Sequence, residues 1–154
     1  MKLSLVLDKI VKTDLDTDIT DVCFDSRRVR SGSLFVAVTG FKTDGHLYIN
    51  SAVEKGAAAI LAEREVEGLS VPVFVVDNTR RALAHAASNF FGDPARSLKM
   101  IGVTGTNGKT TTTTLIKEML EQEGYKVGLI GTIQNMIGDR VLATGHTTPD
   151  AYEL

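Results

Sequence analysis

The sequence predicts an α/β fold, because short apolar runs typical of strands alternate with segments that have helical spacing. With 154 residues, 43% of them hydrophobic and 23% charged, the chain has room for one ordinary domain, or for a small domain and part of another. Gly92, Asp93 and Pro94 break the pattern. We therefore expect a first domain over residues 1–97 and the beginning of a second over residues 98–154.

In the first domain, predicted helices and strands alternate along the chain. The strands are short apolar runs, and the last of them begins near Pro72, which favours a position at the edge of the sheet. Asn78 or Thr79 can cap the last helix, whose apolar residues recur along one face. The helices are expected over residues 3–11, 48–55 and 79–91, and the strands over residues 33–38, 57–62 and 71–76.

The second domain begins with a strand, a glycine-rich turn, a helix and a strand, which together predict one βαβ unit. A hairpin with its turn near Gly138 follows. Thr148, Pro149 and Asp150 then start another helix, with a capping hydroxyl, a proline at the first position and an acid in the first turn. So short a helix is not stable alone, so we expect the C-terminus to be a truncation. The expected ranges are residues 99–104 (strand), 109–123 (helix), 126–131 (strand) and 133–144 (hairpin).

Charge and cysteine content exclude several classes of protein. The formal net charge is −2, so nothing suggests a nucleic-acid or anionic-membrane partner. No stretch approaches the roughly 20 apolar residues that span a bilayer, and Asp8 and Lys9 interrupt the only N-terminal apolar run. Cys23 is the single cysteine, which suits a reducing compartment, and we expect it to be buried. These features predict a cytoplasmic, monomeric protein.

The glycine-rich turn has the context of a phosphate-binding loop, between a predicted strand and a predicted helix. Glycines let backbone N–H groups approach phosphate oxygens, and the helix that follows presents its unpaired amides to the same anion. Lys109 would reach the β- and γ-phosphates and Thr110 would bind Mg²⁺, so these two are the candidate catalytic residues and Thr110 the candidate metal ligand. Val103 stands where the general pattern requires glycine, which leaves open a simple glycine turn. The residues expected to bind ATP are Gly105, Thr106, Asn107, Gly108, Lys109, Thr110 and Thr111.

The loop sequence Gly-Thr-Asn-Gly-Lys-Thr-Thr resembles the ATP loop of the Mur ligases, cytoplasmic enzymes that add amino acids in peptidoglycan synthesis. Asp-Ser-Arg at residues 25–27, Gly-Ser-Leu-Phe-Val-Ala at residues 32–37 and Asp-Gly-His at residues 44–46 are similar to the uridine-nucleotide-binding domain of the third- and fourth-step ligases. The loop, and His-Thr-Thr-Pro-Asp at residues 146–150, resemble the third-step ligases more specifically. The resemblance spans essentially the whole chain.

The resemblance implies a small N-terminal α/β domain that binds the UDP end of the substrate, followed by the truncated start of a P-loop ATPase domain. It also implies ATP and Mg²⁺ as cofactors, with UDP-N-acetylmuramoyl-L-alanyl-D-glutamate and a diamino acid as substrates. The D-glutamate carboxylate would become an acyl phosphate, which the amine of meso-diaminopimelate, or else of L-lysine, would attack. The family's other essential parts lie further downstream, so we expect this chain alone to be inactive. Substrate binding is assigned to Phe24, Ser26, Phe41, Lys42, Thr43, His146, Thr147 and Thr148.

Two other functions stay open at this point. One is the fourth-step ligase, which adds D-alanyl-D-alanine and shares the Asp-Ser-Arg and Asp-Gly-His elements. The other is a non-catalytic module that binds a nucleotide sugar. Without the resemblance, Asp25 and Arg27 would be interpreted as a local ion pair in an exposed turn. His46 would be a partly buried structural histidine, and His85 would face outward from its helix.

Overall fold

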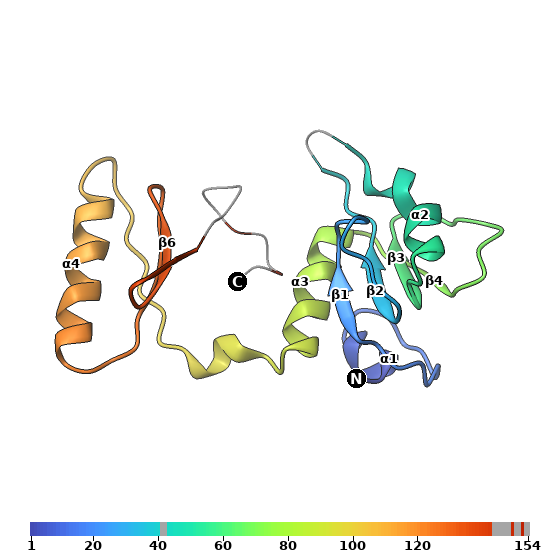
Figure 1. Cartoon of the computed structure of the whole chain (residues 1–154), viewed down its shortest axis with the longest axis horizontal. Coiled ribbons are helices and arrows are strands. Elements are labelled where there is room, and N and C mark those ends of the chain that lie inside the picture. Colours follow the sequence, from blue (N-terminus) through green and yellow to red (C-terminus); the bar gives the residue numbers. More distant parts are fainter. Residues whose placement is uncertain (41–42, 143–148, 150–151, 153–154) are drawn as a thin grey trace. The chain divides into compact units, whose positions relative to one another are not determined.

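The polypeptide forms two compact units, Met1–Ser97 and Leu98–Leu154, in a computed structural model that describes residues 1–40, 43–142, 149 and 152. The predicted α/β class is confirmed: the first unit contains a parallel sheet with helices, and the second a long helix with an antiparallel sheet (Figure 1). Among the described residues, no helix combines the length and the apolar character that a membrane span requires.

The first unit is built on a four-stranded parallel sheet in the order β1-β2-β3-β4. The strands are β1 (Asp21–Cys23), β2 (Ser33–Val36), β3 (Ala59–Ala62) and β4 (Val73–Val75). The last three fall within the predicted strands, and β4 lies at the edge of the sheet, as Pro72 suggested. β1 is absent from the predicted elements. It is only three residues long, and what defines it is its pairing with β2, in which Val22 lies opposite Leu34.

Helices cover both faces of this sheet (Figure 1), as a parallel sheet requires. On one face, Phe35 and Ile60 form a buried cluster with Ile49 of α2. On the other face α3 packs against β1, β2 and β3, with α1 beside it. Side chains alternate along a strand, so buried Leu34 and Leu61 point to the α3 side. The helices are α1 (Leu3–Val6), the 3-10 helix η1 (Gly45–Tyr48), α2 (Ile49–Glu54) and α3 (Thr79–Phe90).

The sequence predicted the start of α3 correctly but not the length of α1. α3 begins as expected, because the Asn78 side chain accepts a hydrogen bond of 2.8 Å from the Arg81 backbone N–H. α1 ends at Val6 instead of residue 11, so its predicted length was wrong. A helix of so few residues has little stability of its own, and the backbone reaches a positive φ of 62° at Lys9.

In the second unit α4 (Lys109–Gln122) accompanies a three-stranded antiparallel sheet in the order β5-β6-β7. The strands are β5 (Gly128–Ile130), β6 (Asn135–Ile137) and β7 (Arg140–Leu142). The predicted helix over residues 109–123 is confirmed. The predicted hairpin is confirmed over its described part, with Gly138 and Asp139 in the turn between β6 and β7.

The predicted strand over residues 99–104 is wrong, and the βαβ unit is therefore not formed. These residues have no regular structure, and Met100 and Ile101 are exposed. A strand exists only where a neighbouring backbone bonds to it, and β5, the other strand of the predicted unit, pairs antiparallel with β6 instead. A short 3-10 helix, η2 (Pro94–Ser97), precedes these residues and begins at the proline of the predicted break.

Candidate functional site

The carboxyl ends of the four parallel strands lie along one edge of the first unit's sheet, which is where open α/β sheets bind their ligands. Phe24 and Ser26 follow β1 directly, and Thr43 belongs to the loop after β2. The structure thus brings three of the predicted substrate residues to one edge. The other predicted substrate residues lie outside the described residues: Phe41, Lys42, His146, Thr147 and Thr148.

The turn after β1 is held by an ion pair within it. The Asp25 carboxylate accepts hydrogen bonds from the Arg27 side chain, at 2.7 Å from Nη2 and 2.9 Å from Nε, and one from the Arg27 backbone N–H. The Arg27 side chain is the main reason why the pKa of the Asp25 carboxyl is lowered. Lys55 Nζ donates to the Ser26 carbonyl oxygen at 2.8 Å, so the turn is also tied to the end of α2. Asp25 and Arg27 therefore form the local pair expected without the family resemblance.

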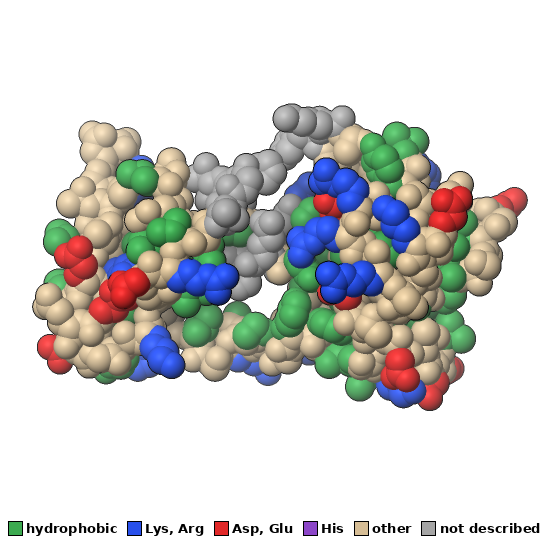
Figure 2. All heavy atoms as spheres, in the orientation of Figure 1, with side chains coloured by type: hydrophobic (Ala, Val, Ile, Leu, Met, Phe, Trp, Pro, Cys, Tyr) green, Lys and Arg blue, Asp and Glu red, His purple; other side chains and the backbone are tan. Residues whose placement is uncertain are grey.

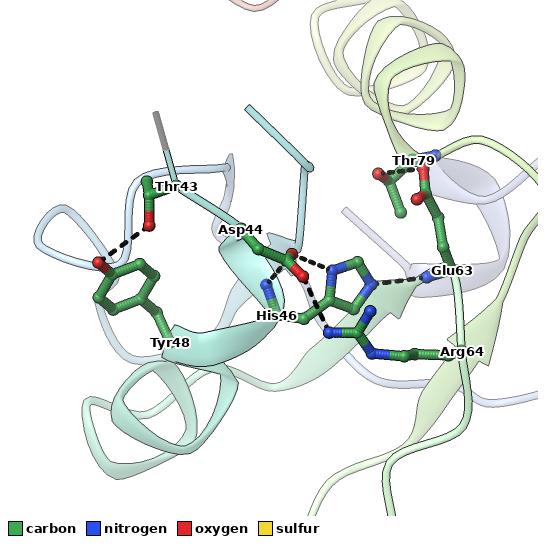
Figure 3. A network of polar contacts seen from close by, with 7 residues as sticks. All are labelled: Thr43, Asp44, His46, Tyr48, Glu63, Arg64 and Thr79. Atoms are coloured by element: carbon green, nitrogen blue, oxygen red, sulfur yellow. Dashed lines mark hydrogen bonds and ion pairs between the residues drawn. The ribbon is translucent and has the colours of Figure 1, made fainter. Parts of the chain in front are cut away.

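A chain of hydrogen bonds links the turns that follow β2 and β3 (Figure 3). Asp44 Oδ1 accepts from the His46 backbone N–H at 2.9 Å and lies 2.6 Å from His46 Nδ1. On the far side of the ring, His46 Nε2 accepts from the Glu63 backbone N–H at 2.9 Å. The His46 side chain is 2% exposed. The ring of His46 is thus buried and hydrogen-bonded at both nitrogens, and His85 is exposed, as expected of a histidine that faces outward.

Two further contacts extend this chain to α3 and to a surface arginine (Figure 3). Glu63 Oε1 accepts from the Thr79 backbone N–H and from its hydroxyl, both at 2.9 Å, at the first turn of α3. Arg64 Nη2 donates to Asp44 Oδ2 at 2.9 Å. The His46 backbone N–H, followed by the His46 ring, holds the pKa of the Asp44 carboxyl far below its usual range. The Thr79 backbone N–H likewise lowers the pKa of Glu63.

The same edge carries exposed positive charge. Arg27 and Arg28 follow β1, Arg64 follows β3 and Arg80 lies in the first turn of α3, and all four are exposed. Figure 2 shows Lys and Arg side chains gathered on the face of the first unit that is turned to the viewer. Glu63 and Arg64 were not among the site residues predicted from the sequence. The signal that could have identified them is their place directly after a buried strand of a parallel sheet.

The glycine-rich turn that is predicted to bind phosphate lies directly before α4 in the second unit. Gly108 adopts a left-handed conformation, with φ 77° and ψ −5°, directly before the first residue of α4. No side-chain cap occupies that end of the helix, and residues 104–112 are exposed. The first amides of a 14-residue helix therefore open to solvent beside a glycine whose missing Cβ leaves space, which is the arrangement that anions bind.

Lys109 lies over this loop. Its Nζ donates to the Gly105 carbonyl oxygen at 2.6 Å and contacts the Thr106 carbonyl oxygen at 3.4 Å. Thr110 is exposed, one position into the helix. Thr113 instead bonds back to the Lys109 and Thr110 carbonyl oxygens, both at 3.0 Å, which shows that the threonines of this run have different roles.

A cavity of about 310 Å³ adjoins the loop, between α4 and the antiparallel sheet. Thr110, Thr113 and Thr114 line it on the helix side, and Leu129 and Met136 line it on the sheet side. Lys117, a further residue of its helix wall, is buried and lies 2.6 Å from Glu121. Thr110, the residue assigned to Mg²⁺, is thus at the border between the open loop and this cavity.

Two family models match the chain. The model for the Mur ligase family, catalytic domain, matches residues 18–91, and the model for the Mur ligase middle domain matches residues 103–154. The chain belongs to the Mur ligase family. In this Mur ligase chain the first match covers the sheet edge with Asp44, and the second covers the phosphate loop with Lys109.

Similarity to individual Mur ligases covers almost the whole chain. A UDP-N-acetylmuramoyl-L-alanyl-D-glutamate--2,6-diaminopimelate ligase of Caldanaerobacter subterraneus subsp. tengcongensis is 50% identical over 94% of this chain and 30% of its own length. A solved structure of a UDP-N-acetylmuramoyl-L-alanyl-D-glutamate--2,6-diaminopimelate ligase is 28% identical, with a TM-score of 0.72 over 99% of this chain and 32% of its own. The MurF ligase of Thermotoga maritima in complex with ADP is 35% identical, with a TM-score of 0.51 over 72% of this chain and 25% of its own.

This Mur ligase chain therefore spans about 30% of the length of the curated relatives it matches. Relatives named as diaminopimelate ligases, the MurE type, are 42–50% identical to it. Solved MurF ligases align with lower TM-scores than the solved diaminopimelate ligase: that of Acinetobacter baumannii has a TM-score of 0.58 at 26% identity, against 0.72. The similarity thus favours the third-step type within the Mur ligase family.

Proposed function

We propose that this chain acts as part of an ATP-dependent ligase that joins meso-diaminopimelate to UDP-N-acetylmuramoyl-L-alanyl-D-glutamate. This is a reaction of peptidoglycan synthesis in the cytoplasm. The observation that carries the proposal is the loop from Gly105 to Thr111 at the open start of α4. It occurs in a chain that is 50% identical to a relative named as a diaminopimelate ligase. L-Lysine remains the alternative amino acid, because nothing in the described residues selects the diamino acid.

The two units would divide the substrates between them. Residues 1–97 would bind the UDP end, through Phe24, Ser26 and the loop that holds Phe41, Lys42 and Thr43. The support is that the described members of this set lie at the carboxyl edge of the sheet, where exposed arginines favour a diphosphate. Residues 98–154 would begin the ATP-binding domain. His146, Thr147 and Thr148 would meet the muramoyl-peptide part of the substrate, as the family resemblance assigns them.

The phosphate loop fits an ATP triphosphate with Mg²⁺. No atom lies within 4 Å of the missing Cβ of Gly108, which leaves space beside the open amides of α4, and the exposed Thr110 hydroxyl is the oxygen type that Mg²⁺ prefers. Lys109 Nζ lies 2.6 Å from the Gly105 carbonyl oxygen, and we propose that it exchanges this bond for phosphate oxygens when ATP binds. The remaining ATP-binding residues would be Thr106, Asn107 and Thr111.

The chemistry of this loop would be positioning and charge neutralisation. The D-glutamate carboxylate would attack the γ-phosphorus of ATP, which would give an acyl phosphate and release ADP. Lys109 would hold positive charge beside the transferring group, and the loop amides would orient it. The amine of the diamino acid would then attack the activated carbonyl carbon, an amide bond would form, and phosphate would leave.

Two other functions have less support. A fourth-step ligase would share the sheet edge, but the solved MurF ligases align with TM-scores of 0.51–0.58 over 72–79% of this chain, against 0.72 over 99% for the solved diaminopimelate ligase. A free-standing nucleotide-sugar-binding module would not require Lys109 over an open phosphate loop. We further propose that the chain alone binds the UDP substrate weakly and forms no amide, since the relatives are about three times as long.

A chimera tests the ligase proposal. The matching segment of the Caldanaerobacter relative is replaced by this chain, and phosphate release is measured with ATP, UDP-N-acetylmuramoyl-L-alanyl-D-glutamate and diaminopimelate. We expect activity, and we expect Lys109→Ala to lower kcat about 100-fold or more, the usual size for loss of a charge-stabilising group. Lys126→Ala is the matched control, an exposed lysine of the same unit outside the loop. Full activity of the Lys109→Ala chimera would contradict the assigned role.

A further inference from the structure

We propose that Asp44 and His46 are positioning residues for the substrate loop after β2, tying Thr43 to the turn after β3 and to the start of α3. The proposal deepens the proposed function and rests on it, because Thr43 is a predicted contact of the UDP substrate. Neither residue would touch the substrate. Their role would be to give Thr43 one defined position at the carboxyl edge of the sheet.

The loop returns to the strand from which it leaves. Thr39 and Asp44 form an antiparallel bridge, and the Gly45 backbone N–H donates to the Val38 carbonyl oxygen at 3.0 Å. Gly45 leaves no room for a side chain, since a Cβ there would lie 2.7 Å from that oxygen. Thr43 directly precedes Asp44 and Gly45 in the chain, so the contacts that hold these two residues also restrict the position of Thr43.

Every polar atom of the Asp44 and His46 side chains makes a hydrogen bond. Asp44 accepts from the His46 backbone N–H and ring on one oxygen, and from Arg64 on the other. His46 Nε2 accepts from the Glu63 backbone N–H, so that nitrogen carries no proton and Nδ1 carries the one donated to Asp44. The ring thus bridges two loops that lie 17 residues apart in the sequence.

Glu63, whose backbone N–H binds the His46 ring, also binds the first turn of α3, so the residues after β2 are connected to a helix. Glu63 places its carboxylate on the backbone N–H and hydroxyl of Thr79, which is fully buried. An apolar residue in place of His46 would leave the Glu63 backbone N–H unpaired and Asp44 with fewer donors. On the loop side, the Thr43 hydroxyl lies 3.2 Å from the Tyr48 hydroxyl, a contact that depends on the same placement (Figure 3).

Three substitutions of His46 separate positioning from simple stabilisation. Asparagine can still donate to Asp44 from the Nδ1 position, glutamine can still accept from the Glu63 N–H at the Nε2 position, and alanine does neither. Binding of UDP-N-acetylmuramoyl-L-alanyl-D-glutamate to the 154-residue chain is measured by calorimetry well below the Tm of each variant. We expect His46→Ala to weaken binding about tenfold, and His46→Asn and His46→Gln about threefold each, from the loss of two bonds or one. His85→Asn, an exposed histidine on α3, is the matched control and should stay within about twofold.

A purely structural histidine would lower the Tm and leave the Kd of the folded variants unchanged, and that result would overturn the proposal. Amide exchange of Gly45 gives a readout that needs no ligand. It should quicken about tenfold in His46→Ala and stay unchanged in His85→Asn. The wild-type chain could bind no UDP substrate while Gly45 exchange still quickens in His46→Ala. That result would contradict the proposed function but support the hydrogen-bonded link from Asp44 through His46 to Glu63. Unchanged exchange of the Gly45 amide in all three His46 variants would show that this link does not hold the residues after β2 in place.

Discussion

The two units differ in what they bury. Apart from Pro149, each aliphatic, aromatic or sulfur-containing side chain that is buried among the described residues belongs to Met1–Ser97, including Phe35 and Leu61 at 0% exposure. In Leu98–Leu154, by contrast, Met100 and Ile133 are each 77% exposed. The strands of both units are mostly apolar, so the composition of the strands does not by itself explain the difference.

The explanation lies in how many faces of each sheet are covered. The parallel sheet of the first unit has α2 on one face and α3 on the other. In the second unit, Leu129 and Met136 face the cavity beside α4, whereas Ile130 and Ile137 point to the opposite face and are exposed. Whether an apolar strand is buried therefore depends on the helices that pack against both faces of its sheet, and not on its own sequence alone.

The largest expected effect is on the core of the first unit. Phe35→Ala should lower the free energy of unfolding of Met1–Ser97 by about 3–5 kcal/mol, because it leaves a cavity between the sheet and α2. Leu115→Ala, on the exposed side of α4, should change the stability of the second unit by less than about 0.5 kcal/mol. Urea unfolding followed by residue-resolved NMR measures both. Equal losses in the two units would contradict the comparison.

A smaller effect is expected from adding one methyl group at matched glycines. Gly45→Ala should destabilise the first unit by about 1–3 kcal/mol, since the new Cβ would lie 2.7 Å from the Val38 carbonyl oxygen. Gly102→Ala should be near neutral, because no atom lies within 4 Å of that position. Thermal unfolding followed by near-UV circular dichroism and tyrosine fluorescence reports the change. A tolerated Gly45→Ala would show that the loop after β2 is less closely packed than it is described.

The smallest effect is on acid stability. The pKa values of Asp44, Glu63 and Asp25 are lowered in the folded first unit by the bonds that these carboxylates accept. Unfolding therefore takes up protons at low pH, so the stabilisation is present above the ordinary pKa of about 4 and is lost as the pH falls below it. Urea midpoints at pH 7, 5, 4 and 3 should fall over the last steps, and Asp44→Asn should flatten that fall. Asp14→Asn, in an exposed loop, is the control and should not alter the slope.

Local signals predicted the elements that have local causes. The Asn78 cap located the start of α3, and the glycine turn ending at Gly108 located the start of α4. The short strand at Asp21–Cys23 was missed and a strand over residues 99–104 was wrongly expected, because a strand depends on a partner that is distant in the sequence. The carboxyl edge shows the same division: Ser26 lies within a recognisable motif, whereas Arg64 reaches Asp44 across 20 residues.

The α/β class and the likeness to the Mur ligases could be recognised from the amino-acid sequence alone, as could the glycine-rich turn in which Lys109 and Thr110 are predicted to bind ATP and Mg²⁺. Each of these rests on residues that are neighbours in the chain. Tertiary structure alone decided that His46 lies between Asp44 and Glu63, and that Lys109 rests on the Gly105 carbonyl oxygen. The physical reason is that hydrogen bonds and burial act between atoms that are close in space, and only the folded backbone brings these atoms together.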